Sequence, residues 1–116
     1  MRRGEIYLVN FGKRYGSEFG KIRPALIVQN DIANRNIDKV AFKGVTLVPL
    51  TTMVAGGALR VFVNKRDKLE KDSEICINEL CTLDQSRIYL DRILTTLTQN
   101  EMEEVEQKLQ RHLGLR

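Results

Sequence analysis

Arg23 is the residue whose type and place in the chain best suit chemistry on an anion. It stands with Pro24 at the start of an apolar run, 22–29, directly after a polar stretch, 10–21, that glycines divide. A guanidinium keeps its charge at physiological pH and forks onto phosphate or carboxylate oxygens. A strand that begins here would hold that charge at the mouth of a surface loop. The alternative is a structural or surface salt bridge.

Histidine and cysteine are too scarce for the usual catalytic and metal-binding arrangements. His112 is the only histidine, and Cys76 and Cys81 are the only cysteines. A structural zinc site usually has four Cys or His ligands, so we expect no metal and no cofactor. Cys76 lies in an apolar run and is expected in the core. Because the histidine lies near the C-terminus, any catalysis is expected to proceed without a histidine base.

The charges divide the chain into a basic part and an acidic part. Residues 1–66 hold twelve Lys and Arg against four Asp and Glu, whereas residues 67–116 hold seven against eleven. The basic part favours a polyanionic partner, with nucleic acid foremost, and a solvated basic surface is the alternative. The length suits a single domain, 1–116, and no apolar run is long enough to cross a membrane. We therefore expect a cytoplasmic protein with no membrane partner.

The pattern of apolar residues predicts a mainly β protein. Short apolar runs separated by turn residues favour a small barrel over a sheet with alternating helices. Pro24 has no N–H for a ladder, which places it near a strand start or at an edge, and Gly44 is expected to form a bulge. The expected strands are 5–9, 22–29, 40–51, 58–63, 74–78, 80–83 and 93–94, with a turn or single helical turn at 30–34.

The C-terminal segment carries the signals of an α-helix. Thr98 and Glu101 form a capping box, in which each side chain satisfies a backbone N–H at the helix start. Leu97 and Met102 are spaced for a hydrophobic staple, and Gly114 stands where a C-terminal cap belongs. One face carries the apolar stripe Met102, Val105, Leu109 and Leu113. We expect this face to cover an open side of the barrel.

Five sequence blocks follow one another along most of the chain. They are Arg3-Gly4-Glu5-Ile6-Tyr7; residues 16–20; Arg23-Pro24 to Asn30-Asp31 with Asn34; Val48-Pro49-Leu50-Thr51-Thr52; and Asp72-Ser73 with residues 82–87. In this order and spacing the blocks resemble the MazF/PemK family of toxin endoribonucleases, the toxin halves of toxin–antitoxin pairs. The resemblance implies a small SH3-like barrel of the MazF/CcdB type with a C-terminal α-helix. It also implies a homodimer that cleaves single-stranded RNA, usually mRNA, at short sequences without a metal.

The residues themselves suit such a reaction. RNA can be cut without a metal when its own 2′-OH attacks the adjacent phosphate, if the enzyme stabilises the added negative charge. Arg23 suits this task, although a guanidinium holds its protons too tightly to be a good general acid. The resemblance places the catalytic threonine at Thr51, whose hydroxyl could donate to a phosphate oxygen or orient the 2′-OH. Glu18 is the candidate base, and pairing with Lys21 is its alternative.

Other residues are candidates for RNA binding rather than catalysis. They are Phe11, Ser17, Phe19, Thr52 and Glu79. Aromatic side chains near the loop could stack on unpaired bases, although one of them is expected to pack beneath the loop. Thr52 should point to the opposite face from Thr51 if the strand continues. Glu79 occupies a position where the resemblance implies a polar residue that contacts a base.

Asp84 and Arg87 have a structural interpretation. They flank a tight turn, where an aspartate and an arginine three residues apart can close an ion pair. The same two residues belong to the family's T-x-D-x-x-R block. We nevertheless expect them to fix the turn.

Two other kinds of protein are alternatives to a ribonuclease. Related toxins of the same fold bind DNA gyrase instead of cutting RNA, and they would not need Arg23 and Thr51 to converge on one groove. A non-catalytic RNA-binding barrel is the other alternative. For a ribonuclease toxin, the expected partner is a MazE-like antitoxin with an acidic, disordered tail drawn to the basic part of the chain. The resemblance further implies that the toxin–antitoxin complex binds DNA.

Overall fold

A computed structural model describes residues 1–13 and 21–115 of the chain. These residues form β1 (Glu5–Asn10), β2 (Ile22–Ile27), β3 (Gly44–Thr51), β4 (Arg60–Val63), β5 (Ser73–Cys76), β6 (Cys81–Asp84) and β7 (Thr95–Thr96). They also form the α-helices α1 (Asp31–Arg35) and α2 (Gln99–His112) and the 3₁₀ turns η1 (Ile37–Lys39), η2 (Ile77–Glu79) and η3 (Gln85–Arg87). The predicted fold class, mainly β with a C-terminal helix, is confirmed.

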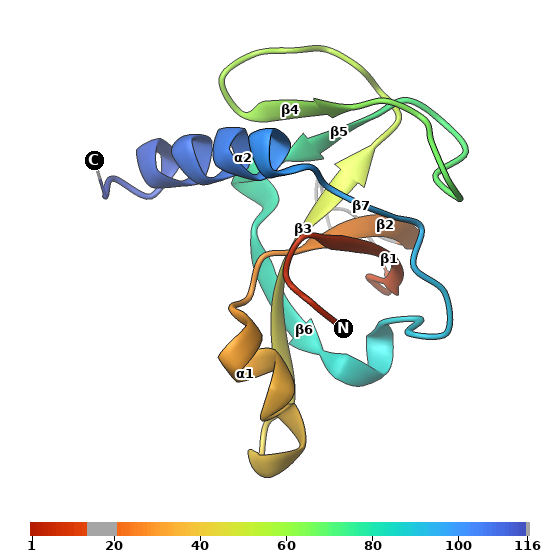
Figure 1. Ribbon diagram of the computed structural model, residues 1–116, viewed down its shortest axis with the longest axis vertical. Helices are drawn as coiled ribbons and strands as arrows, with labels where there is room; N and C mark the ends of the chain where they lie inside the picture. The colour runs from red at the N-terminus through yellow and green to blue at the C-terminus, as the bar shows by residue number, and fades with distance from the viewer. Residues whose placement is uncertain (14–20, 116) are drawn as a thin grey trace.

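The strands build one curled antiparallel sheet, with α2 lying against it (Figure 1). The strand order is β4-β5-β3-β2-β1-β7, and β6 pairs with β3 beside this path. β3 is the central strand, because its first half pairs with β6, its middle with β2 and its end with β5. The strand that ends at Thr51 therefore joins the two parts of the sheet.

Apolar side chains form a core cluster on each face of β2. Leu26 belongs to the cluster that α2 covers, whereas Ala25 and Ile27 belong to the cluster on the opposite face. All three side chains are fully buried. The second half of β2 is thus buried on both faces. Its first half, which contains Arg23, is more exposed.

The C-terminal helix begins as its sequence predicts. The Thr98 hydroxyl accepts a hydrogen bond from the Glu101 amide at 3.2 Å, and the Glu101 carboxylate accepts one from the Thr98 amide at 2.9 Å. Val105 is fully buried, and Gly114 has a φ of +71°, which suits a C-terminal glycine cap. The apolar stripe ends one turn early, because Leu113 is exposed instead of packed.

The segment before β3 differs from its prediction. The third strand begins at Gly44 and not at Val40, because residues 40–42 form bends after η1. A Cβ on Gly44 would meet the ring of Phe42, which is exposed, and would lie 2.9 Å from the Thr82 methyl group on the paired strand. A glycine at this position leaves room for both side chains. The last strand also differs, since it is Thr95–Thr96 and not 93–94.

Candidate active site

Arg23 on β2 and Thr51 on β3 lie just beyond the end of the ladder that joins these two strands. Arg23 pairs with Val9 of β1, and the last pair between β2 and β3 joins Ala25 to Pro49. Arg23 and Thr51 each lie two residues beyond that last pair, where β2 and β3 are no longer paired with each other. Residues two apart in a strand share a face, so both side chains belong to the face of Ala25 and Pro49. The sequence analysis expects these two residues to act together. The register places them on one face of the sheet, and their joint action stays a prediction.

Prolines stand where the β2–β3 ladder ends. Pro49 belongs to the last ladder pair, and Pro24 directly follows Arg23. Neither residue has an N–H with which to continue the ladder. Beyond this point β3 pairs with β5 instead, through Leu50 and Thr51. Arg23 and Thr51 therefore flank the place where the sheet divides.

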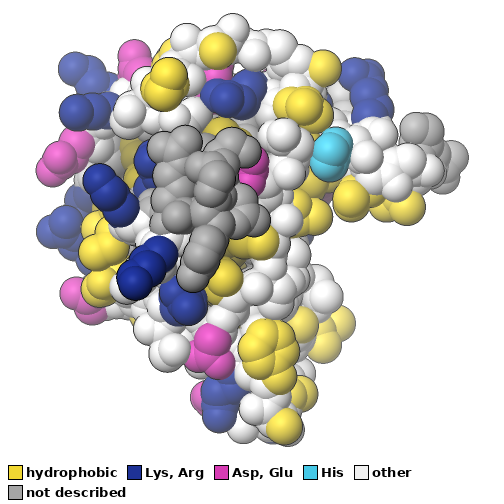
Figure 2. Space-filling model, turned by 180° about the vertical axis from the view of Figure 1, so that it is seen from behind, with side chains coloured by type: hydrophobic (Ala, Val, Ile, Leu, Met, Phe, Trp, Pro, Cys, Tyr) yellow, Lys and Arg dark blue, Asp and Glu magenta, His cyan; other side chains and the backbone are white. Residues whose placement is uncertain are grey.

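The positive charge of Arg23 acts on β5, which pairs with the end of β3. Arg23 is half-buried. Burial raises the pKa of the Cys76 thiol on β5, and the charges of Arg60 and Arg23 oppose that rise. Two arginines thus contribute positive potential near the end of β3. Lys and Arg side chains also gather on the face of the molecule seen in Figure 2. This potential favours an anionic ligand.

The Thr51 hydroxyl is buried and oriented. Its side chain is 7% exposed, and its Oγ1 accepts a hydrogen bond from the Met53 amide at 3.2 Å. That bond occupies an acceptor position on the oxygen and leaves the O–H as a donor. A donor held in this way can meet an anionic oxygen without first reorganising.

Glu74 is a buried carboxylate that the sequence analysis assigned only to a strand. It lies opposite Thr51 in the β3–β5 ladder and is 3% exposed. Its carboxylate accepts hydrogen bonds from the amides of Ala55 and Gly56, both at 2.9 Å, and forms an ion pair with Arg60 at 3.2 Å. The bond from the Ala55 amide lowers the pKa of Glu74 against the effect of burial, and Gly56 and Arg60 lower it further. The signal in the sequence was a lone acidic residue inside an apolar strand.

A cleft on the same side of the sheet brings two of the predicted RNA-binding residues together. Phe11 and Glu79 both line this cleft, with Pro49 and Arg87, around a volume of about 440 Å³. Thr52 is not among its lining residues, and it lines a different pocket described below. The predicted roles of Ser17, Glu18 and Phe19 fall outside the described residues.

Asp84 and Arg87 do not form the expected ion pair with each other. Asp84 caps η3 by accepting a hydrogen bond from the Ser86 amide at 2.9 Å, and hydrogen bonds from Ser86 lower the pKa of Asp84. Arg87 instead donates to the Asn10 carbonyl at 3.1 Å. The two residues hold the backbone separately, because the 3₁₀ turn directs Arg87 toward the end of β1.

The described residues contain neither a group of metal ligands nor a membrane-spanning helix. Across 1–13 and 21–115, no three His, Cys, Asp or Glu side chains are grouped closely enough to hold a metal ion. None of the helices in these ranges is long and apolar enough to cross a membrane.

The fold defines a class of solved toxin structures. The crystal structure of MazF from Deinococcus radiodurans has a TM-score of 0.78 and 23% identity, covering 98% of this chain and 96% of that one. An endoribonuclease in complex with its cognate antitoxin, from a mycobacterial species, has a TM-score of 0.75 and 26% identity, covering 100% and 97%. The curled sheet and its C-terminal helix therefore have the same fold as these solved toxin structures.

Sequence comparison gives the family. Endoribonuclease MazF of Staphylococcus epidermidis is 35% identical over 119 residues, which cover 99% of this chain and 92% of that protein. The family model described as PemK-like, MazF-like toxin of type II toxin–antitoxin system matches residues 2–113. The chain therefore belongs to the PemK-like, MazF-like toxin family, as its five sequence blocks predict.

Proposed function

We propose that this MazF-family endoribonuclease toxin cleaves single-stranded RNA at short sequences, without a metal, by attack of the RNA's own 2′-OH. The observation that carries the proposal is that Arg23 and Thr51 lie on one face of the sheet, each two residues beyond the last β2–β3 pair. One residue supplies a permanent positive charge, and the other supplies an oriented hydroxyl donor. Both groups suit a phosphate whose negative charge increases during reaction.

The reaction needs no group from outside the RNA and the protein. The 2′-oxygen forms a bond to phosphorus, its proton leaves to a base, and the bond from phosphorus to the 5′-oxygen breaks. The departing 5′-oxygen takes up a proton, so the products are a 2′,3′-cyclic phosphate and a 5′-hydroxyl. Arg23 stabilises the negative charge on the phosphorane oxygens, while Thr51 donates to one of them. Glu18 stays the candidate base.

The test is cleavage of RNA in the presence of EDTA. Wild-type protein should cut a long single-stranded RNA at a small set of sequences and leave 5′-hydroxyl ends. Removal of one preorganised charge or donor costs about 100-fold or more in rate, so Arg23→Ala and Thr51→Val should lose most of the activity. Thr51→Ser, which keeps the hydroxyl, is the matched control and should keep most of it.

Two results would decide against the proposal. Equal cleavage by the wild type and by Arg23→Ala would remove the assigned chemistry. Failure of the wild type to cut any RNA, combined with inhibition of DNA gyrase in a supercoiling assay, would establish the gyrase-binding alternative instead.

We also propose that the protein forms a homodimer and binds an antitoxin with an acidic, disordered tail. Solved structures with MazE from Deinococcus radiodurans and with a cognate antitoxin from a mycobacterial species support this kind of partner. The excess of Lys and Arg in residues 1–66 would attract such a tail. Light scattering after size exclusion should give twice the chain mass, and a monomer at micromolar concentration would contradict the dimer. Co-expression of the neighbouring gene should suppress toxicity.

A further inference from the structure

A second pocket lies on the reverse side of the strand ends that carry Arg23 and Thr51. Its volume is about 220 Å³, and Pro24 and Thr52 both line it. Pro24 follows Arg23 within β2 and therefore points to the opposite face, and Thr52 follows Thr51 at the bend after β3. Each residue of the proposed catalytic pair is thus followed directly by a residue of this pocket. The pocket and the candidate active site are therefore separated by one residue along the chain at both places.

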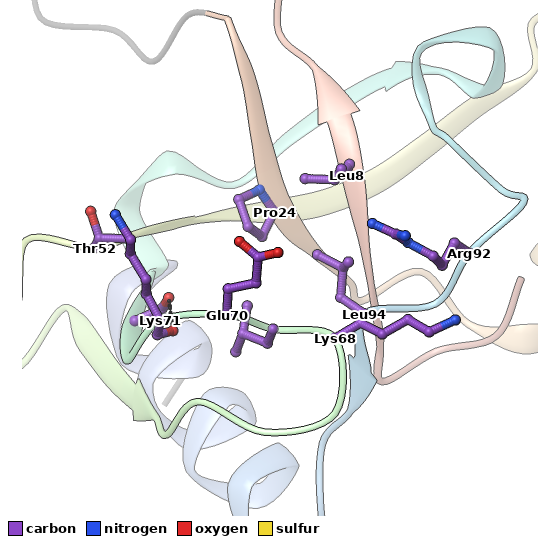
Figure 3. A pocket seen from close by; sticks show the side chains of 10 residues that line it. Leu8, Pro24, Thr52, Lys68, Glu70, Lys71, Arg92 and Leu94 are labelled. Atoms are coloured by element: carbon purple, nitrogen blue, oxygen red, sulfur yellow. Dashed lines mark hydrogen bonds between the residues drawn. The ribbon is translucent and has the colours of Figure 1, made fainter.

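The pocket has an aliphatic floor and a charged rim (Figure 3). Its aliphatic residues are Leu8, Pro24, Leu69 and Leu94. The charged residues are Lys68, Glu70, Lys71 and Arg92. In Figure 3, the Glu70 carboxylate points toward Pro24, the Arg92 guanidinium points into the pocket, and Lys71 rises toward Thr52.

These charges are not used by the rest of the described structure. The side chains of Glu70, Lys71 and Arg92 make no hydrogen bond or ion pair with one another or with other residues in 1–13 and 21–115. Charged side chains elsewhere in the described residues form direct ion pairs, such as that of Arg66 with Glu101 at 2.6 Å. Unpaired charges that surround an aliphatic floor are suited to a ligand that has both a flat apolar part and polar edges.

We propose that this pocket binds a nucleobase with an exocyclic amino group, next to the scissile phosphate of the RNA. The inference rests on the proposed ribonuclease function. Aliphatic side chains can hold the faces of the base, and the Glu70 carboxylate accepts from its amino group, as carboxylates do from cytosine. Lys71 and Arg92 contact the flanking phosphates. Uracil has no such amino group, so it binds less well.

The position of Glu70 favours RNA over an acidic peptide. A carboxylate at the rim that points toward Pro24 repels the carboxylates of such a peptide, whereas a base amino group is a donor that it attracts. The volume suits one base rather than a long segment. An antitoxin tail is therefore an alternative outcome of the test.

The test uses a randomised single-stranded RNA pool and short RNAs derived from it. Sequencing of cleaved ends compares the wild type with Glu70→Gln, and anisotropy measures binding of uncleaved RNA to proteins that also carry Arg23→Ala. At one position beside the cut, the wild type should favour bases with an amino group over uracil. Glu70→Gln should reduce this ratio by roughly tenfold. Lys71→Ala and Arg92→Ala should each weaken binding of all sequences and reduce the slope of log affinity against log salt by roughly 0.7.

Controls outside the pocket separate these effects from a general change in charge. Glu103 and Lys65 are exposed and do not line the pocket, so Glu103→Gln and Lys65→Ala should change neither the sequence preference nor the salt slope. Cleavage with an unchanged preference and slope in the pocket variants would overturn the subsite and leave the proposed function standing. Variants that weaken only antitoxin binding would also overturn it. RNA neither bound nor cut by the wild type would overturn both proposals.

Discussion

Glu74 lies directly opposite Thr51 in the β3–β5 ladder, and its buried carboxylate holds the loop that leaves Thr51. The amides of Ala55 and Gly56 donate to this carboxylate, and Arg60 pairs with it. Thr51 ends its strand, so the position of its hydroxyl depends on the chain that follows it. The structure thus gives Thr51 a support that lies 23 residues away in the sequence.

Replacing Glu74 with glutamine should destabilise the protein. The amide keeps one acceptor oxygen but places N–H groups against backbone donors, and Arg60 loses its charged partner. A lost charged hydrogen bond in a buried place costs about 1–3 kcal/mol. Urea unfolding should show a decrease of that size for Glu74→Gln, while the exposed control Glu103→Gln stays within about 0.5 kcal/mol of wild type. Equal stability of both variants would contradict the role of the carboxylate.

The contribution of Glu74 should depend on pH in one direction. Its pKa is lower in the folded protein than in the unfolded chain. The unfolded chain therefore binds the proton more readily, and this part of the stability is present above the unfolded pKa of about 4.3 and is lost as the pH falls through the lower folded pKa. The difference in unfolding free energy between wild type and Glu74→Gln should shrink from pH 7 to pH 3. A difference that grows on acidification would show the opposite shift.

The sequence was sufficient for features that depend on neighbouring residues. The capping box of Thr98 and Glu101 is local, so its pattern predicted both hydrogen bonds. Arg23 was proposed from its type and place at a strand start, and Thr51 from the family resemblance; their catalytic roles stay predictions. Glu74 was not recognised as a support, because its partners at 55, 56 and 60 meet it only when β3, β4 and β5 have paired. Asp84 and Arg87 were assigned to each other by spacing alone, whereas η3 turns Arg87 toward Asn10.

Arg66 should stabilise the protein through the geometry of its guanidinium. It donates to both carboxylate oxygens of Glu101, at 2.6 and 2.9 Å, and to Asn64 at 2.8 Å. This arrangement joins the segment after β4 to the start of α2. A lysine keeps the charge but loses the fork, so Arg66→Lys should lower the unfolding free energy by about 1–2 kcal/mol. Arg111→Lys, at an exposed position of α2, is the matched control. Identical melting curves would refute the prediction.

Both cysteines should react slowly in the native protein. Burial raises the pKa of the Cys76 thiol and of the Cys81 thiol. Since the thiolate is the reactive form, labelling by a disulfide reagent at pH 7.5 should be slow in buffer and fast in urea. Rapid reaction of two thiols without denaturant would show that the core around β5 and β6 opens readily.

The most direct test of the account is a double-mutant cycle on Arg23 and Thr51. Single-turnover cleavage of one defined RNA, in EDTA, gives rate constants for the wild type, Arg23→Ala, Thr51→Val and the double variant. If both residues act on the same phosphate, the double variant should be little slower than the slower single variant. Losses in rate that multiply independently, or single variants as fast as the wild type, would contradict a shared site.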